Sequence, residues 1–194
     1  MEITPNEMQR YMIYLKNQSY TREDAASLLS KARCLISDPE IIIRDTRVST
    51  HYIEFDTSIP ENKNVQDIIC KLVMIMPLSE YEHIVEKDME KEEAIKYARN
   101  LFNIEKYWQA HEILESVWKN SHDGEKDLLN GIILIAAAFV HDEKAESFIC
   151  ISILKRAMKK LANASGVYFG IDLDEIKDRM SKIIQTGNIR RFTI

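Results

Sequence analysis

The residues best suited to chemistry in this sequence lie in one run, Phe102–Trp118 (FNIEKYWQAHEILESVW). Within it His111 and Glu115 are four residues apart, which on a helix separates their Cβ atoms by about 5–6 Å. At that spacing an imidazole and a carboxylate can hydrogen-bond to each other or hold one ion between them. The candidate catalytic residues are therefore His111 as ligand or general base, Glu115 as its orienting partner or second ligand, and Glu112 as a polar rim residue.

The helical periodicity of this run predicts which way the pair faces. At about 100° per residue, one arc of roughly 120° collects most of the large apolar side chains together with the pair. That arc contains Ile104, Tyr107, Trp108, His111, Leu114, Glu115 and Trp118. The pattern predicts a buried His–Glu pair near the middle of the inward face, between two tryptophans.

A second polar stripe belongs to the apolar run of residues 125–141. It places Asn130 and His141 on one line, from which both can come within reach of His111 in a bundle. Because zinc usually takes three or four ligands, the predicted metal ligands are His111, Glu115 and His141. The residues predicted to line the pocket are Tyr107, Trp108, Trp118 and Asn130.

Two interpretations of the pair stay open. In one, it lines a pocket that binds a small molecule or a divalent metal, where buried polar groups gather. In the other, the protein is a non-enzymatic interaction or scaffold module, and the pair is a structural clasp whose disruption would cost about 3–5 kcal/mol. The sequence contains no His-Glu-x-x-His motif, no repeated Glu-x-x-His, and no nucleophile, phosphate-loop or Rossmann pattern. A divalent metal is the one cofactor that these residues suggest.

The first 86 residues show the signals of an α+β domain in the order strand, helix, strand, strand, helix, strand. This order predicts a ferredoxin-like βαββαβ sandwich, with four antiparallel strands backed by two helices. A capping box at Thr21 and Asp24 starts the first helix, and Pro39 and Pro77 end the two helices. The expected strands are Arg10–Lys16, Ile41–Arg44, His51–Asp56 and Leu78–Ile84.

Residues 87–194 carry only helical signals and predict an all-α five-helix bundle. Asn103 and Asp142 are expected to cap the second and fourth helices, and Asp172 the fifth. Gly187 is expected to stop that fifth helix. The expected helices are 88–101, 103–119, 125–141, 142–163 and 172–187, with the third, apolar nearly all round, at the centre.

Composition narrows the classes of partner. The net charge of −5 disfavours nucleic acid, which needs a basic face to neutralise phosphates. A ferredoxin-like sheet sometimes binds RNA through aromatic residues, but here Glu54 and Asp56 share the face of Tyr52 and would repel phosphate. The longest apolar run, Gly131–Val140, is about half a membrane span.

Three widely spaced cysteines, Cys34, Cys70 and Cys150, indicate reduced thiols, and no signal-peptide pattern opens the sequence. We therefore expect a cytoplasmic protein that makes no membrane contact, and we expect it to be a homo-oligomer.

The run that carries the His–Glu pair resembles the signature of the domain-of-unknown-function 309 family. That signature reads Phe-Asn-x-x-x-[Tyr/Phe]-Trp-x-Ala-His-Glu-x-Leu-Glu-x-x-Trp and corresponds here to Phe102–Trp118. The resemblance extends through Gly131 and residues 136–138 to His141, and again at residues 170–172, so that it covers the C-terminal half. The N-terminal segment lies outside it and has the character of an added module.

The resemblance implies a small helical bundle and the activity of a metal-dependent hydrolase, without naming a substrate. It also implies that Trp108, His111, Glu112, Glu115 and Trp118 are the signature positions. This chain departs from the family in two places. Asn130 stands where the family often has Gln, and Ala145-Glu146-Ser147 stands where the family has a glycine-containing turn.

Overall fold

The computed structural model describes residues 7–85 and 89–194, and the chain forms two compact units, residues 1–87 and 88–194. Each unit has its own buried apolar cluster. Among the described residues no helix is both long and apolar enough to cross a membrane.

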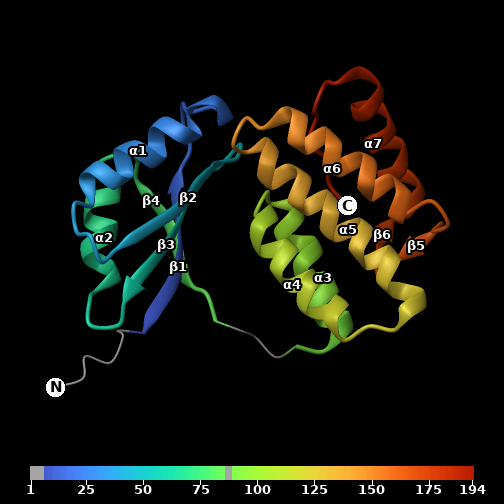
Figure 1. Cartoon of the computed structure of the whole chain (residues 1–194), viewed down its shortest axis with the longest axis horizontal. Helices are drawn as coiled ribbons and strands as arrows, with labels where there is room; N and C mark the ends of the chain where they lie inside the picture. The colour runs from blue at the N-terminus through green and yellow to red at the C-terminus, as the bar shows by residue number, and fades with distance from the viewer. Residues whose placement is uncertain (1–6, 86–88) are drawn as a thin grey trace. The chain divides into compact units, whose positions relative to one another are not determined.

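The first unit is the predicted ferredoxin-like sandwich. Four strands form an antiparallel sheet in the order β2-β3-β1-β4, and two helices cover one of its faces (Figure 1). The strands are β1 (Met8–Lys16), β2 (Ile42–Val48), β3 (Tyr52–Pro60) and β4 (Leu78–His83), and the helices are α1 (Ala25–Leu35) and α2 (Val65–Leu72). A short 3-10 helix, Arg22–Asp24, leads into α1, and the Thr21 N–H donates to the Asp24 carboxylate at 2.8 Å, as the capping box predicts.

Strands β2 and β3 extend further than expected, to Val48 and Pro60. The prediction stopped both strands where polar residues interrupt the apolar alternation. The backbone ladder continues there regardless, because Thr57 and Ser58 pair with Ile43 and Ile42. Inward-facing Ile13, Leu15, Ile53 and Phe55 pair across β1 and β3 and form the core with the helices.

The opposite face of this sheet carries ion pairs between arginines and buried carboxylates. Arg47 Nε donates to Glu54 at 2.6 Å, and Arg10 Nε donates to Asp56 at 2.9 Å. Burial by itself would lower the pKa of Arg47, but the carboxylates of Glu54 and Asp45 raise it above its ordinary value. The two acids predicted to repel phosphate are thus each neutralised by an arginine.

The second unit is a helical bundle in which helices that are consecutive along the chain pack side by side (Figure 1). A short hairpin lies where a loop was expected. Its two strands, β5 (Val167–Tyr168) and β6 (Ile171–Asp172), have two residues each. The helices are α3 (Lys91–Asn103), α4 (Tyr107–Lys119), α5 (Asp123–Asp142), α6 (Ser147–Lys160) and α7 (Leu173–Thr186).

The expected ends of α7 are confirmed. The Asp172 carboxylate accepts N–H bonds from Asp174 and Glu175, each at 3.0 Å, and Gly187 follows the helix with a φ of 70°. The other two predicted caps are wrong, since Asn103 and Asp142 are the last residues of α3 and α5. Asp88, the expected start of the first helix, lies outside the described residues.

Both wrong caps have the same physical cause. After α3, Lys106 N–H bonds to the carbonyl of Leu101 and Glu105 N–H to that of Phe102, which is the Schellman arrangement of a helix C-terminus. After α5, Glu146 and Ala145 repeat this arrangement. In each case the chain therefore makes a left-handed turn before the next helix starts, with φ at 62° for Glu105 and 60° for Ala145.

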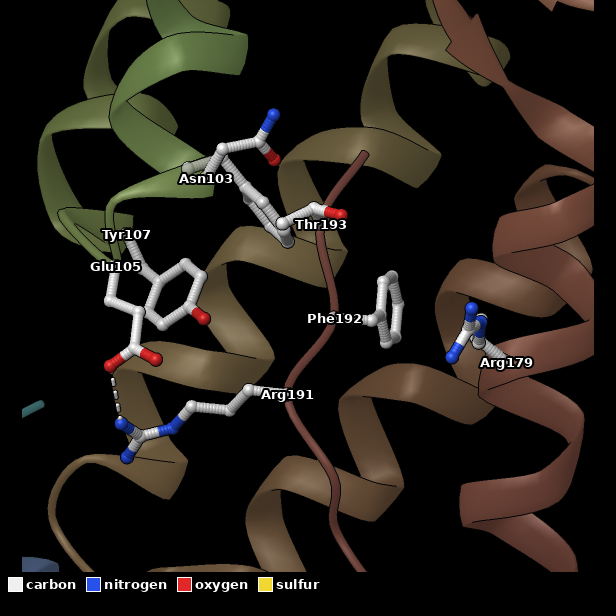
Figure 2. Close-up of a pocket in the computed structure, with 8 residues that line it drawn as sticks. Asn103, Glu105, Tyr107, Arg179, Arg191, Phe192 and Thr193 are labelled. Atoms are coloured by element: carbon white, nitrogen blue, oxygen red, sulfur yellow. Dashed lines mark hydrogen bonds and ion pairs between the residues drawn. The ribbon is translucent and has the colours of Figure 1, made fainter. Parts of the chain in front are cut away.

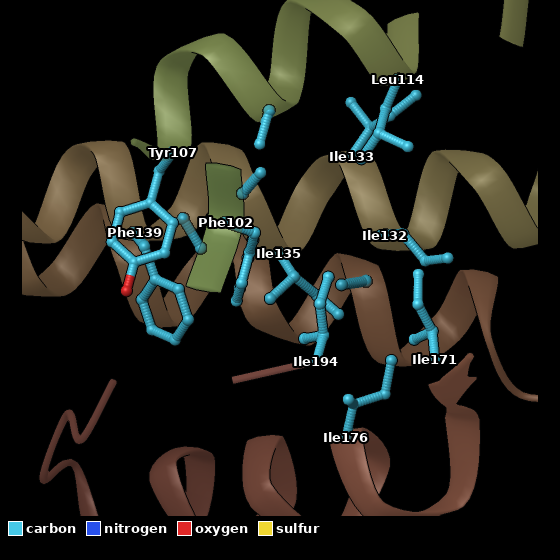
Figure 3. Close-up of a cluster of buried hydrophobic side chains, with 14 of the residues drawn as sticks. Phe102, Tyr107, Leu114, Ile132, Ile133, Ile135, Phe139, Ile171, Ile176 and Ile194 are labelled. Atoms are coloured by element: carbon cyan, nitrogen blue, oxygen red, sulfur yellow. The ribbon is translucent and has the colours of Figure 1, made fainter. Parts of the chain in front are cut away.

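The core of the bundle surrounds α5. Figure 3 shows Phe139 and Ile135 of α5 beside Phe102, Tyr107 and Ile194. Gly131 allows α5 to approach the end of α6, because a Cβ at that position would lie 2.5 Å from the Leu161 side chain.

Candidate functional site

Helix α4 directs one set of side chains into the bundle and a second set along the edge of that buried face. Tyr107, Ala110, Leu114 and Val117 are buried and recur at helical spacing. A second stripe lies about 100° around the helix from this face. It consists of the side chains at the i, i+3, i+4 and i+7 positions, which are Trp108, His111, Glu112 and Glu115. The signature residues with metal-ligating side chains thus share one stripe.

Three side chains of this stripe form a potential metal-ligand group. His111, Glu112 and Glu115 each offer one ligand atom, and these atoms all lie within 4.8 Å of one another. His111 Nδ1 is 3.3 Å from Glu112 Oε1, and Lys119 Nζ is 4.0 Å from Glu115 Oε1. Among residues 7–85 and 89–194 it is the one such group of three or more ligating side chains. We refer to it as the α4 triad.

The α4 triad is not buried, so the prediction of a buried pair is wrong. The side chains of His111, Glu112 and Glu115 are 26%, 45% and 39% exposed. The predicted arc was centred too far toward Trp108, because the large aromatic ring was counted as inward-facing. The small residue Ala110 and Val117 instead define the centre of the packed face, which leaves the His–Glu pair at its edge.

The exposure argues against a large stabilising role for the pair as a clasp. A buried ion pair is costly to break because one charge stays behind without solvent. Surface pairs contribute about 0–1 kcal/mol, and water reaches all three members of the α4 triad.

The other residues predicted to surround the pair lie in different surroundings. Trp108 and Trp118 are half-buried, and Lys126 Nζ lies 5.8 Å from the centre of the Trp118 ring, a cation–π contact with α5. Asn130 is half-buried on α5. His141 is not a member of the α4 triad, and its Nδ1 contacts the Glu146 carboxylate across the α5–α6 turn.

Tyr107, predicted as a pocket residue, lines a different cavity. This cavity has a volume of about 310 Å³ and opens beside the α3–α4 turn (Figure 2). Burial raises the pKa of Tyr107, and the nearby carboxylates of Glu105 and Glu143 raise it further. Its phenol therefore remains a neutral hydrogen-bonding group. The lining residues are Phe102, Asn103, Glu105, Tyr107, Arg179, Arg191, Phe192 and Thr193.

An ion-pair network forms one wall of this cavity. Arg191 Nη1 lies 3.0 Å from Glu105 Oε2, and Arg191 Nε donates to Asp142 Oδ2 at 2.9 Å. Burial would lower the pKa of Arg191, but Glu143, Asp142 and Glu105 raise it. Glu105 makes this contact from a left-handed backbone conformation, which costs a residue other than glycine about 1–2 kcal/mol.

Sequence reasoning missed this network. Asn103 was assigned only as a helix cap, while Glu105 and Arg191 were assigned no role. One signal was available: the basic and aromatic residues of Arg190-Arg191-Phe192 follow the glycine that stops α7. Phe192 and Ile194, which follow that glycine, are apolar residues of types that are often buried.

The fold and site define a class of protein with a ferredoxin-like unit and a helical bundle that exposes a His/Glu/Glu group on one helix. Within the bundle, residues 95–147 match the model of the family described as Domain of unknown function (DUF309). The matched stretch includes the α4 triad, Glu105 and the turn at Ala145.

The chain is also similar to one curated protein. An uncharacterized protein from Aquifex aeolicus (strain VF5) is 30% identical over 98 residues. The aligned region covers 50% of this chain and 29% of the relative. The chain thus spans under a third of that protein.

Proposed function

We propose that the α4 triad binds a divalent metal ion, and that the protein acts as a metal-dependent hydrolase. The observation that carries the proposal is the convergence of one imidazole and two carboxylates within 4.8 Å on a single exposed stripe. His111 and Glu115 are the ligands expected from the sequence. Glu112 takes the third position in place of His141, which contacts Glu146.

The donor set fits such an ion chemically. Imidazole suits zinc, iron or nickel, and carboxylates suit magnesium or manganese, so a mixed set accepts several divalent metals. Ligand atoms on one ion are at most about 4.2 Å apart, twice a metal–ligand bond of about 2.1 Å. The three side chains therefore have to close slightly around the ion, and their exposure leaves them room to rotate.

Three protein ligands leave coordination positions open, as catalytic sites require. A divalent metal in such a site would lower the pKa of a bound water molecule and so supply hydroxide near neutral pH. In this proposal His111, Glu112 and Glu115 hold the ion. Trp108, one turn before His111 on the same stripe, is half-buried.

The test is the metal content of untagged, unchelated protein, measured by plasma mass spectrometry. We expect about one equivalent of zinc, manganese, iron or nickel, and its loss in His111→Ala and Glu115→Gln. The matched control is His122→Ala, which removes an exposed histidine from the same unit and should retain the metal. No bound metal and no uptake after reconstitution would end the proposal.

A second candidate function is a non-enzymatic interaction module that forms homo-oligomers. It is supported by Phe148, whose side chain is 87% exposed at the start of α6, next to Ile149, which is 41% exposed. An exposed apolar pair of this kind is suited to an interface. Sedimentation at several protein concentrations should reveal association that Phe148→Ser weakens. A concentration-independent monomer would contradict this candidate.

A further inference from the structure

The segment 188–194 packs into the bundle without forming a helix or a strand. It follows Gly187 and runs between the α3–α4 turn and α7 (Figure 2). Its hydrogen bonds to the bundle are made with side chains rather than with a neighbouring strand. The segment thus lies in its groove as a bound peptide would.

One set of contacts between the groove and the segment is electrostatic. Arg191 is held by Glu105 and Asp142, which come from the α3–α4 turn and the end of α5. The side chain of Arg191 is only 17% exposed, and that of Asp142 only 4%. Because the planar guanidinium presents its donors in a fixed fork, the two acids, bonded to its Nε and Nη1, favour arginine at this position.

A second set of contacts is apolar and involves the side chains of Phe192 and Ile194. The ring of Phe192 lies 5.2 Å from that of Phe139 and 6.3 Å from that of Phe102, measured between ring centres. Ile194 is 7% exposed and belongs to the bundle core, near Ile135 in Figure 3. Thr193 between them is exposed. The groove therefore fits a segment with an arginine, an aromatic residue, any residue and an aliphatic residue, in that order.

A third set of contacts consists of hydrogen bonds to the backbone of Ile194. Asn103 Oδ1 accepts the Ile194 N–H at 2.8 Å, and Asn103 Nδ2 donates to the Ile194 carbonyl at 3.0 Å. Arg99 Nε donates to the same oxygen at 2.7 Å. Gly170 leaves the space that Arg99 needs, since a Cβ there would lie 2.8 Å from the guanidinium. This contact is independent of the peptide's side chain and fixes its register.

We propose that this groove is a peptide-binding site, which residues 191–194 fill as an intramolecular ligand. Its ligand class is an extended segment with the pattern Arg-aromatic-x-aliphatic. The cavity of about 310 Å³ that remains beside the segment shows that the groove is larger than its present occupant. The proposal does not depend on metal binding at the α4 triad.

Release of the segment can be tested by cutting the chain beside Gly187, which ends α7 at an accessible site. Gly187 has a φ of 70°, and residues 185–188 are exposed. A recognition sequence for a specific protease can therefore be inserted after Gly187, so that the folded protein is cut without a truncated chain having to fold. Circular dichroism before and after the cut reports whether the bundle survives.

Peptide exchange on the cut protein tests the proposal. A fluorescent peptide of residues 188–194 (NIRRFTI) should bind with saturation, as measured by anisotropy, and unlabelled peptide should displace it. The uncut protein should bind it at least about tenfold more weakly, because its own segment competes at a high effective concentration. A cut protein that unfolds, or that never exchanges its segment, would show that residues 191–194 are a permanent part of the core.

Variants of peptide and protein test the recognition pattern. The Arg191→Ala peptide should bind about tenfold more weakly or worse, since it loses two charge-assisted hydrogen bonds. The Thr193→Ala peptide is the matched control and should bind within about twofold of the original. Asn103→Asp in the protein should weaken every peptide alike. Equal binding of all three peptides would overturn the proposed specificity.

Discussion

The side-chain amide of Asn103 pairs with the backbone of Ile194 in both directions, accepting its N–H and donating to its carbonyl oxygen. Asparagine and glutamine are the residues whose side chains carry both a carbonyl acceptor and an NH₂ donor. A contact between residues 91 positions apart in the chain thereby explains why asparagine follows Phe102 at the end of α3.

Asn103→Asp should destabilise the protein. The substitution keeps the acceptor for the Ile194 N–H but places a carboxylate oxygen against the Ile194 carbonyl, where a donor stood. Arg99 still donates to the carbonyl oxygen of Ile194, so the loss is that of one hydrogen bond, about 0.5–1.5 kcal/mol. Urea denaturation measures this loss. Asn100→Asp makes the same change at an exposed position of α3 and should lose less than about 0.5 kcal/mol.

His111→Ala should leave the free energy of unfolding of the metal-free protein within about 1 kcal/mol of the original. The imidazole is a quarter exposed and its contact with Glu112 is at the surface, where ion pairs contribute little. Leu114→Ala, one turn further into the core, should cost about 2–5 kcal/mol. Thermal and urea unfolding of both variants test the contrast. A loss for His111→Ala as large as that for Leu114→Ala would restore the clasp interpretation.

Ala145→Gly should stabilise the protein by about 1 kcal/mol. Ala145 has a φ of 60° at the end of α5, a conformation that penalises a Cβ and in which helix ends favour glycine. The comparison is Ala26→Gly, an exposed position inside α1, where glycine should reduce stability instead. Unfolding free energies of the two variants should move in opposite directions, and a loss in both would contradict the backbone argument.

Glu125 should make the free energy of unfolding depend on pH in the acidic range. Burial opposes its ionisation, but hydrogen bonds from Lys91 and Tyr168 outweigh burial and lower its pKa. The unfolded chain therefore binds a proton at higher pH than the folded one. The stability from this carboxylate is present above the unfolded value of about 4.3 and is lost as pH falls through the lower folded value.

The measurement for Glu125 is urea unfolding at pH 7 and at stepwise lower pH. Glu125→Gln should reduce stability at pH 7 and flatten its decline toward pH 3. Glu92→Gln removes an exposed ion pair with Lys96 and should change stability by less than about 0.5 kcal/mol at pH 7. An unchanged acid-side slope in Glu125→Gln would refute the assignment.

Much of the fold follows from local patterns. The alternation of Ile53 and Phe55 and the helical recurrence of Leu28 and Ala32 give strands and helices in the correct order, because both patterns reflect one buried face per element. Asp172 and Gly187 mark the ends of α7 for equally local reasons. The signature run likewise brought His111, Glu112 and Glu115 to one side of one helix, since residues three and four apart always meet there.

The sequence by itself determined the element order, the sandwich-and-bundle fold and the closeness of His111 and Glu115, because each depends on neighbours within one or two turns. The tertiary structure decided the rest. It rotated α4 so that Ala110 rather than His111 faces the core, and it joined Arg191 to Glu105 across 86 positions. Which helix face is buried, and which distant charge meets which, depends on the shape of the packed partners, and no local periodicity encodes that shape.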